Sequence, residues 1–482
     1  MECTRGSTPD HPRRLLSSGR ATGLLLLLLL AFCAPRRPEG IDDAPLGRDG
    51  QDKYRGVSLH DPEELARYPV GQPDTTRLLK AGGFSARLLS GHDGRVRVIW
   101  SAGLSNDFAP DIPDAIYQEI LGPGGGPRRV LVQGREGSLP LLLDAASGRN
   151  GALQILWTDH EYPSGRLGPG MGKTLLQSIG EGTHSTGIPV FDDISRQNLN
   201  PLHLGRFLEP SIETLDARHG LVCWLEPPRN PKLDAVERAF FGSNPVCRPY
   251  DDVTGEIGGM TTLTKRSVAF MASASGQDGM GHVSWFGDGL RYRRHRDGRW
   301  SESERVPGRV GNTRRRDGFI FGLGMTTDRD GAPVIGFLAD EAQEGTRRYV
   351  LLVARRTTRG WSTTRGYLPI PLRLENRTPV RLIADDDGLH VHVLFRADAM
   401  PDRGPGADRS HSEKVAHPLI YAEIEGDRVN TLSVLRTDSG PGSFDLRQDG
   451  SSVQHILWDE TAAGNYRLMH ATLVGERSPV SE

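Results

Sequence analysis

The sequence predicts an all-β protein, a seven-bladed β-propeller, with six- or eight-bladed propellers as the alternatives. Two observations carry this prediction. A strand pattern returns seven times within residues 81–482, and no long apolar pattern of helical period follows the N-terminal segment. The 59 glycines and 33 prolines among 482 residues also favour frequent turns over helices.

Each copy of the repeat is a Gly or Asp-Gly turn followed by a short strand of alternating apolar residues that ends in an aromatic residue. The aromatic positions are Trp100, Trp157, Trp224, Trp285, Phe337, Phe395 and Trp458. Their spacing fits a four-stranded blade with sizeable loops. Radial packing shields the sheet edges, whereas a β-sandwich does not call for seven equivalent hairpin pairs.

A second hairpin follows the aromatic residue in several copies. In one copy Leu290 to Arg293 leads to Asp297-Gly298, and Asp-Gly supplies the positive backbone dihedral of a tight hairpin. The last copy ends near Leu473 and lacks an outer strand. We expect residues Thr76 to Lys80 to supply this strand and close the ring.

The first residues, 1–34, are typical of an export signal, because arginines precede a leucine run that is short for a membrane span. Cys33 resembles the lipidated cysteine of bacterial lipoproteins, although Phe32 departs from that pattern. We expect an extracellular or periplasmic protein, and a lipid anchor at Cys33 is the one membrane contact that the sequence offers as an alternative to free secretion. Residues 35–80 are expected to form a flexible spacer, and residues 81–482 the propeller.

The charge balance, the cysteines and the histidines indicate which partners and ligands to expect. The 59 basic and 61 acidic side chains nearly cancel, which argues against nucleic acid as a partner. Cys223 and Cys247 either pair in an oxidising compartment or remain buried thiols, and the sequence leaves both open. His390 and His392 alternate on a strand without a third ligand, so we expect no metal, and no cofactor. We expect a monomer.

The repeat resembles the BNR or sialidase-like propeller superfamily over roughly residues 84–475. The match rests on the Asp-Gly turn, the strand ending in Trp or Phe, and the endings Asp297-Gly-Arg-Trp-Ser301 and Arg359-Gly-Trp-Ser362. It is a match to a repeat and not to a catalytic signature, since the Arg-Ile-Pro motif of sialidases is missing. The resemblance implies ligand sites on the face where the connection after each second strand opens.

Polar residues after the aromatic positions, and in the long excursions of the second and third copies, are therefore the candidate site. Carboxylates with Tyr and His can perform acid and base chemistry on a glycosidic bond or a uronic acid, and Arg can bind a sugar acid. The plainer interpretation is that Asp caps turns. The catalytic candidates are His160, Tyr162, Tyr250 and Asp251, and the substrate-binding candidates are Asp159, His184, Glu226, Arg248, Asp340 and Asp398.

These residues predict a propeller that binds or processes extracellular carbohydrate, as a glycoside hydrolase or a polysaccharide lyase. The alternative is a non-catalytic propeller that serves as a sugar- or protein-binding scaffold. The fold does not decide between them.

Overall fold

A computed structural model describes residues 57–69 and most of residues 85–475. The main gaps are residues 102–114, 162–170, 192–209, 227–242, 309–319 and 400–417. Every secondary-structure element within the described ranges is a β-strand. None of those residues forms a helix long and apolar enough to cross a membrane. The predicted export signal and Cys33 lie outside the described residues.

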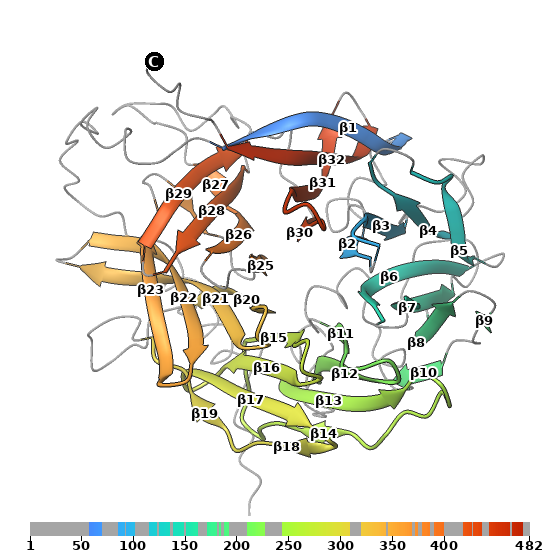
Figure 1. Cartoon of the computed structure of the whole chain (residues 1–482), viewed down its shortest axis with the longest axis horizontal. Coiled ribbons are helices and arrows are strands. Elements are labelled where there is room, and N and C mark those ends of the chain that lie inside the picture. Colours follow the sequence, from blue (N-terminus) through green and yellow to red (C-terminus); the bar gives the residue numbers. More distant parts are fainter. Residues whose placement is uncertain are drawn as a thin grey trace, which may run out of the picture. The chain divides into compact units, whose positions relative to one another are not determined.

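Seven antiparallel sheets follow one another around a ring, so the predicted seven-bladed propeller is confirmed (Figure 1). The strands of each blade are given from the inner strand outwards. Blade 1 consists of β2 (Ser85–Ser90), β3 (Val96–Ser101), β4 (Ala115–Ile120) and β5 (Arg129–Gln133). Blade 2 consists of β6 (Ser138–Ser147), β7 (Leu153–Glu161), β8 (Met171–Gly180) and β10 (Ile188–Phe191), with β9 (Thr183–His184) paired to β8, and blade 3 of β11 (Ser211–Thr214), β12 (His219–Glu226), β13 (Asn244–Asp251) and β14 (Thr261–Thr262).

Blades 4 to 7 continue the same order. Blade 4 consists of β15 (Phe270–Ser275), β16 (Gly281–Phe286), β17 (Leu290–Arg296) and β18 (Arg299–Trp300), with β19 (Glu304–Arg305) paired to β17. Blade 5 consists of β20 (Ile320–Thr327), β21 (Pro333–Gln343), β22 (Thr346–Thr357) and β23 (Gly360–Tyr367), and blade 6 of β25 (Val380–Ala384), β26 (His390–Arg396), β28 (Leu419–Glu425) and β29 (Arg428–Leu435). Blade 7 consists of β30 (Phe444–Gln448), β31 (Gln454–Ala462), β32 (Asn465–Gly475) and β1 (Val57–Pro69). A small separate pair joins β24 (Leu372–Arg373) and β27 (Asp398–Ala399).

The hydrophobic core lies between neighbouring blades. One cluster joins Phe270 and Tyr292 of blade 4 to Phe337 and Leu352 of blade 5. Because each sheet is covered on both faces, its second strand is apolar on both, and β16 has five consecutive buried residues. All seven aromatic positions of the repeat lie on second strands and are buried.

The predicted hairpin chemistry is confirmed at the turn between β17 and β18. Arg296 pairs with Arg299, so the loop has two residues, Asp297 and Gly298. Both have positive φ, 50° and 73°, as the right-handed twist of a two-residue hairpin requires.

The strand that closes the ring comes from a different segment than predicted. β1 pairs antiparallel with β32 along its whole length, and Figure 1 shows the blue N-terminal strand beside the red C-terminal one. The expected closure by an N-terminal strand is therefore confirmed in kind, but residues 57–69 supply it, and the prediction that all of residues 35–80 form a spacer is wrong. The pairing buries Leu65 and Ala66 against blade 1. Residues Thr76 to Lys80 lie outside the described residues.

The third blade contains a second correction. The excursion from Glu226 to Leu263 was expected to be a loop, but β13 occupies its middle and pairs with β12 over eight residues. Cys223 and Cys247 face each other across this pair and form a disulfide with an S–S distance of 2.08 Å, which settles the alternative that the sequence left open. Arg248, Tyr250 and Asp251 consequently lie on a strand.

Candidate functional site

The inner strands of all seven blades enclose a cavity of about 640 Å³ along the centre of the ring. Its walls carry the six charged residues Arg87, Asp144, Glu213, Arg381, Asp445 and Arg447. Three are cations and three are anions. This cavity is thus polar and internally balanced in charge.

Four of these residues occupy one level of the ring. Arg87 and Asp144 pair with the residues that precede Trp100 and Trp157 on the second strands. Arg381 and Asp445 hold the same place relative to the aromatic residues of blades 6 and 7. Arg381 and Asp445 are the second residues of β25 and β30, so this level lies toward the face where the inner strands begin and the connections to the third strands open. That is the face on which the sequence placed the site.

Each charged side chain reaches the inner strand of the next blade. Arg87 Nε lies 2.8 Å from Asp144 Oδ1, and its Nη2 donates to the Leu143 carbonyl at 3.0 Å. Asp144 Oδ2 in turn accepts the Ile212 N–H at 2.9 Å. An inner strand has one edge without a β partner, so side chains from the neighbouring blade satisfy its backbone groups.

The junction of blades 7 and 1 is held in the same way. Asp445 Oδ2 accepts the Leu88 N–H at 2.8 Å, and Arg447 Nε donates to the Leu88 carbonyl at 2.9 Å. Two side chains of β30 therefore hold both backbone groups of one residue of β2. Asp445 also lies 3.5 Å from Arg381 Nε, which links blade 6 to this junction.

The electrostatics of this level keep its arginines charged. Burial opposes the charge of Arg87, but the carboxylates of Asp144 and Asp445 outweigh it and raise its pKa. Burial and the Arg87 guanidinium lower the pKa of Arg381 to about 10. Arg381 therefore remains a cation at neutral pH, and its side chain is 31% exposed.

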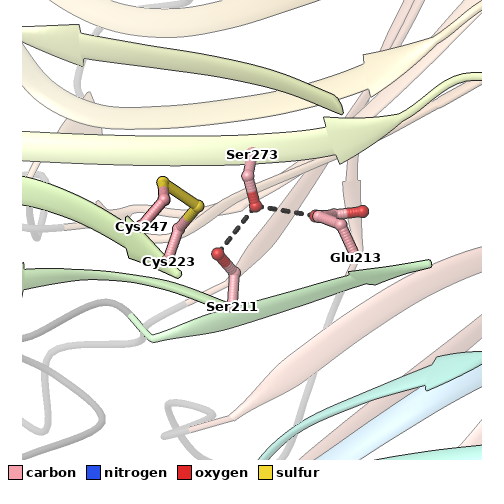
Figure 2. Close-up of a disulfide and its surroundings, with 5 residues drawn as sticks. All are labelled: Ser211, Glu213, Cys223, Cys247 and Ser273. Carbon is pink, nitrogen blue, oxygen red and sulfur yellow. Dashed lines mark hydrogen bonds between the residues drawn. A yellow bond between two sulfur atoms is a disulfide. The ribbon is translucent and has the colours of Figure 1, made fainter. Parts of the chain in front are cut away.

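Glu213, on β11, is the titratable group of the channel. Ser273 Oγ, from blade 4, donates to Glu213 Oε1 at 2.7 Å and lies 2.7 Å from Ser211 Oγ (Figure 2). The second carboxylate oxygen points away from both serines, and the disulfide joins the neighbouring strands β12 and β13. Burial, and secondarily Asp144, raise the pKa of Glu213 to about 7, so both protonation states are populated near neutrality.

Six of the predicted site residues have described side chains, and none of these six lines this channel: Asp159, Glu226, Arg248, Tyr250, Asp251 and Asp340. Glu226 Oε2 instead accepts the Trp224 indole N–H at 2.6 Å. The same arrangement recurs in blade 7, where Glu460 accepts the Trp458 indole N–H at 3.0 Å. An acid two residues after a blade Trp therefore satisfies a buried donor, which explains part of the acidic pattern that followed the aromatic positions.

The three candidates on β13 also have structural partners. Arg248 Nε donates to the Gly258 carbonyl at 2.9 Å. Asp251 lies 2.6 Å from Arg218 Nε and accepts the backbone N–H groups of its own turn. Tyr250 is buried between blades 2 and 3, where its hydroxyl donates to the side chain of Gln154, and burial raises its pKa.

The remaining candidates on described strands are spread over four of them. Asp159 and His160 lie near the end of β7, His184 on β9, Asp340 on β21 and Asp398 on β27. The side chains of His160, His184 and Asp398, and all of Tyr162, lie outside the described residues. No observation tests the roles of these residues, and they stay predictions.

No group of three metal-ligating side chains gathers within the described part of the chain. His392, which the sequence placed in the core or channel, is buried, and its ring nitrogens lie 2.6 Å from the Tyr421 hydroxyl and 2.9 Å from Asp385. A buried His–Tyr pair recurs in blade 4, where His282 lies 2.7 Å from the Tyr292 hydroxyl. These histidines join the second and third strands of their blades.

Comparisons with known proteins concern the fold. No protein-family model and no curated protein matches this chain. Among similar solved structures, an ulvan lyase bound to -[GlcA(1-4)Rha3S]- has 12% identity and a TM-score of 0.43, covering 89% of this chain and 98% of its own. The intramolecular trans-sialidase of Ruminococcus gnavus has 11% identity and a TM-score of 0.34, covering 81% and 94%. An alpha-L-arabinanase of Penicillium chrysogenum has 11% identity and a TM-score of 0.37, covering 69% and 94%.

The channel residues were open to sequence reasoning but were missed. Each lies in the short apolar stretch before the first turn of a copy, as in Val380-Arg381-Leu382 and Phe444-Asp445-Leu446. A charged residue within an apolar first strand is the signal, because first strands line the channel. The loops after the second strands drew attention instead.

Proposed function

We propose that the protein binds and processes an extracellular carbohydrate at the central channel, with Glu213 as its proton-transferring residue and Arg381 as a ligand-binding cation. The observation that carries the proposal is the placement of Glu213 in a cavity whose walls also hold three guanidinium groups. A rigid cavity with a few convergent polar groups is the usual form of a ligand site.

The chemistry of the channel suits a sugar that bears a carboxylate. Arg381 is partly exposed and pairs only loosely with Asp445, so it can turn one edge of its guanidinium toward a ligand. Guanidinium groups bind carboxylates through two parallel hydrogen bonds. An acidic sugar would meet a cation on blade 6, and hydroxyl groups would meet Ser273 and Ser211 on the opposite side.

Glu213 fits the role of a general acid or base. A proton-transfer group works best when its pKa lies near the working pH, and burial brings Glu213 to about 7. In glycoside hydrolysis such a group protonates the leaving oxygen, and in elimination from a uronic acid a base removes the proton next to the carboxylate. Ser273 holds one oxygen of Glu213 and thereby fixes the direction of the other.

A non-catalytic propeller is the second candidate. Arg87, Asp144, Asp445 and Arg447 all bond to neighbouring blades, so these contacts stabilise the ring without any ligand. Glu213 and Arg381 also contact the next blade, through Ser273 and Asp445. On this alternative Glu213 would bind a ligand without transferring a proton.

A panel of polyuronates and neutral glucans of equal length, scored for retention and for product release, separates the two. We expect retention and product with a polyuronate, loss of product with retained binding in Glu213→Gln, and weaker binding in Arg381→Gln. Arg266→Gln, an exposed arginine outside the channel, should behave as the parent. If polysaccharides are retained but none of them yields product, the proposed catalysis is overturned. If no polysaccharide is retained, the proposed binding is overturned as well.

A further inference from the structure

The outer hairpins of blades 4 and 5 carry an unusual density of arginine. The segment from Thr346 to Tyr367, which forms β22 and β23, contains six arginines and no acidic residue. In blade 4 the β17–β18 hairpin adds three exposed arginines. We call the set Arg294, Arg296, Arg299, Arg356 and Arg359 the blade 4–5 arginine surface.

Strand register brings these side chains together. Arg294 and Arg296 alternate with the buried His295, so they share one side of β17, and Arg296 pairs with Arg299 across the turn. From blade 5, the Arg356 guanidinium lies 5.9 Å from the centre of the Tyr292 ring and 3.0 Å from Glu304. Burial raises the pKa of Tyr292, and Arg356 and Arg294 both oppose that rise, so both cations lie close to this phenol.

The surface has few counter-charges. Glu304 is occupied by Arg356 and by the Trp361 indole at 3.3 Å, and the Arg296–Asp297 pair is exposed with 3.7 Å between its atoms. Arg294, Arg299 and Arg359 have no acidic partner among the residues that the structure describes. An exposed pair such as Arg296–Asp297 holds its cation only weakly, because water screens it.

The two flanking blades have the opposite sign at the same hairpin. In blade 3 the turn after β13 carries Asp251, Asp252 and Glu256. In blade 6 the end of β28 carries Glu423 and Glu425. Protection of outer strands against aggregation needs charge of either sign on every blade, whereas arginine is concentrated here on two adjacent blades.

We propose that the blade 4–5 arginine surface binds an extended acidic polysaccharide. Sulfate and carboxylate groups match the forked donors of guanidinium, and a chain that bears them at intervals can contact both blades at once. The choice of polysaccharide over another polyanion rests on the proposed function. The location of the arginine surface does not rest on the proposed function. Hairpins between third and fourth strands open on the face opposite the connections that follow the second strands, so this surface is separate from the channel site.

Such a surface would hold a polymer while another part of it is at the channel. It therefore contributes to affinity for long chains and not for short ones, since a short oligosaccharide cannot occupy both sites. Its contribution is electrostatic and must fall as salt rises.

The test compares Arg294→Gln/Arg296→Gln/Arg299→Gln with a control that removes three exposed arginines elsewhere, Arg95→Gln/Arg218→Gln/Arg266→Gln. Binding to polygalacturonate, dextran sulfate, neutral dextran and a single-stranded DNA of similar length is measured at several salt concentrations. We expect the first triple variant to lose about tenfold in affinity for the two acidic polysaccharides at low salt, the control less than about twofold, and neutral dextran to bind to neither.

Three results would overturn the proposal. They are equal losses in the two triple variants, tighter binding of the DNA than of either acidic polysaccharide, and binding that does not fall with salt. Arg381→Gln separates this site from the channel. Loss of binding there, with full binding in the first triple variant, supports the channel and rejects the arginine surface, whereas the reverse result rejects the channel and retains the surface.

Discussion

His470 Nδ1 on β32 lies 2.7 Å from Glu63 Oε1 on β1, across 407 residues of sequence. His470 also lies 2.9 Å from His455, whose far nitrogen lies 3.4 Å from Asp449. The closing strand is thus tied to the last blade by a line of polar contacts as well as by its backbone ladder. Leu457, which pairs with His470, belongs to the apolar cluster shared with blade 1.

Removal of the closing strand should therefore weaken the whole ring. A chain that begins at residue 57 should unfold at about the temperature of the full chain, because the ladder with β32 is intact. A chain that begins at residue 70 should lose several degrees or fail to fold, since it exposes the outer edge of β32. Circular dichroism on heating measures both. Equal unfolding temperatures for the two chains would show that β1 does not close the ring.

The histidine contact itself can be tested with one residue. Glu63→Ala removes the acceptor of a buried ring N–H, and we expect a loss of about 1 kcal/mol in the free energy of unfolding. Glu63→Gln keeps an acceptor oxygen and should lose less. Denaturant titrations of the two variants provide the comparison, and equal losses would mean that the hydrogen bond contributes nothing.

Stability should fall on mild acidification. Burial lowers the pKa of His282 to about 4, and it also lowers that of His470. The unfolded chain then binds protons more tightly than the folded one below about pH 6.5. The stabilisation is complete above that pH and is lost as pH falls toward 4, by about 3 kcal/mol for His282 alone. Denaturant titrations at pH 7, 6, 5 and 4 test this, and His282→Gln should flatten the slope while the exposed His219→Gln should not.

Asp445 should be among the most sensitive positions of the channel. It is 3% exposed, accepts the Leu88 N–H and lies beside Arg381. Asp445→Ala leaves an unpaired N–H and uncompensated guanidinium charge, and we expect a loss of about 3 kcal/mol. Asp330→Ala, at an exposed turn, is the matched control. A loss below about 1 kcal/mol would show that water replaces the carboxylate.

The disulfide should stabilise blade 3. Cys223 and Cys247 are separated by 24 residues and are both fully buried. Replacement of both by Ala should lower the free energy of unfolding by about 3 kcal/mol. Cys33→Ser should leave it unchanged, because that residue precedes the first described strand by more than twenty positions. Mass spectrometry of unreduced peptides checks that the bond is present in the purified protein.

Tyr250→Phe distinguishes the predicted catalytic role from the observed position. Burial raises the pKa of Tyr250, so its hydroxyl stays protonated at neutral pH and donates to Gln154. We expect a loss of about 1 kcal/mol in stability, because Gln154 loses its donor, and no loss of product release. Loss of product with unchanged stability would restore the catalytic prediction.

The sequence by itself determined the number of blades, the register of the second strands and the turn chemistry. These features are local. An alternating strand, an aromatic residue at its end and a Gly or Asp-Gly turn recur within each copy, so each copy can be recognised from its own residues. The need for a closing strand also followed from the sequence, because the last copy visibly lacked one.

Tertiary structure alone decided which segment closes the ring and which side chains meet in the channel. β1 has little apolar alternation, and it is a strand because β32 offers an unpaired edge. Arg87 and Asp144 are 57 residues apart, and Asp445 and Leu88 are 357 apart, yet each pair is in contact because the ring brings neighbouring inner strands side by side. Single-strand patterns contain no information on such pairings, which is why the predicted site fell on the loops and the observed charges lie on the inner strands.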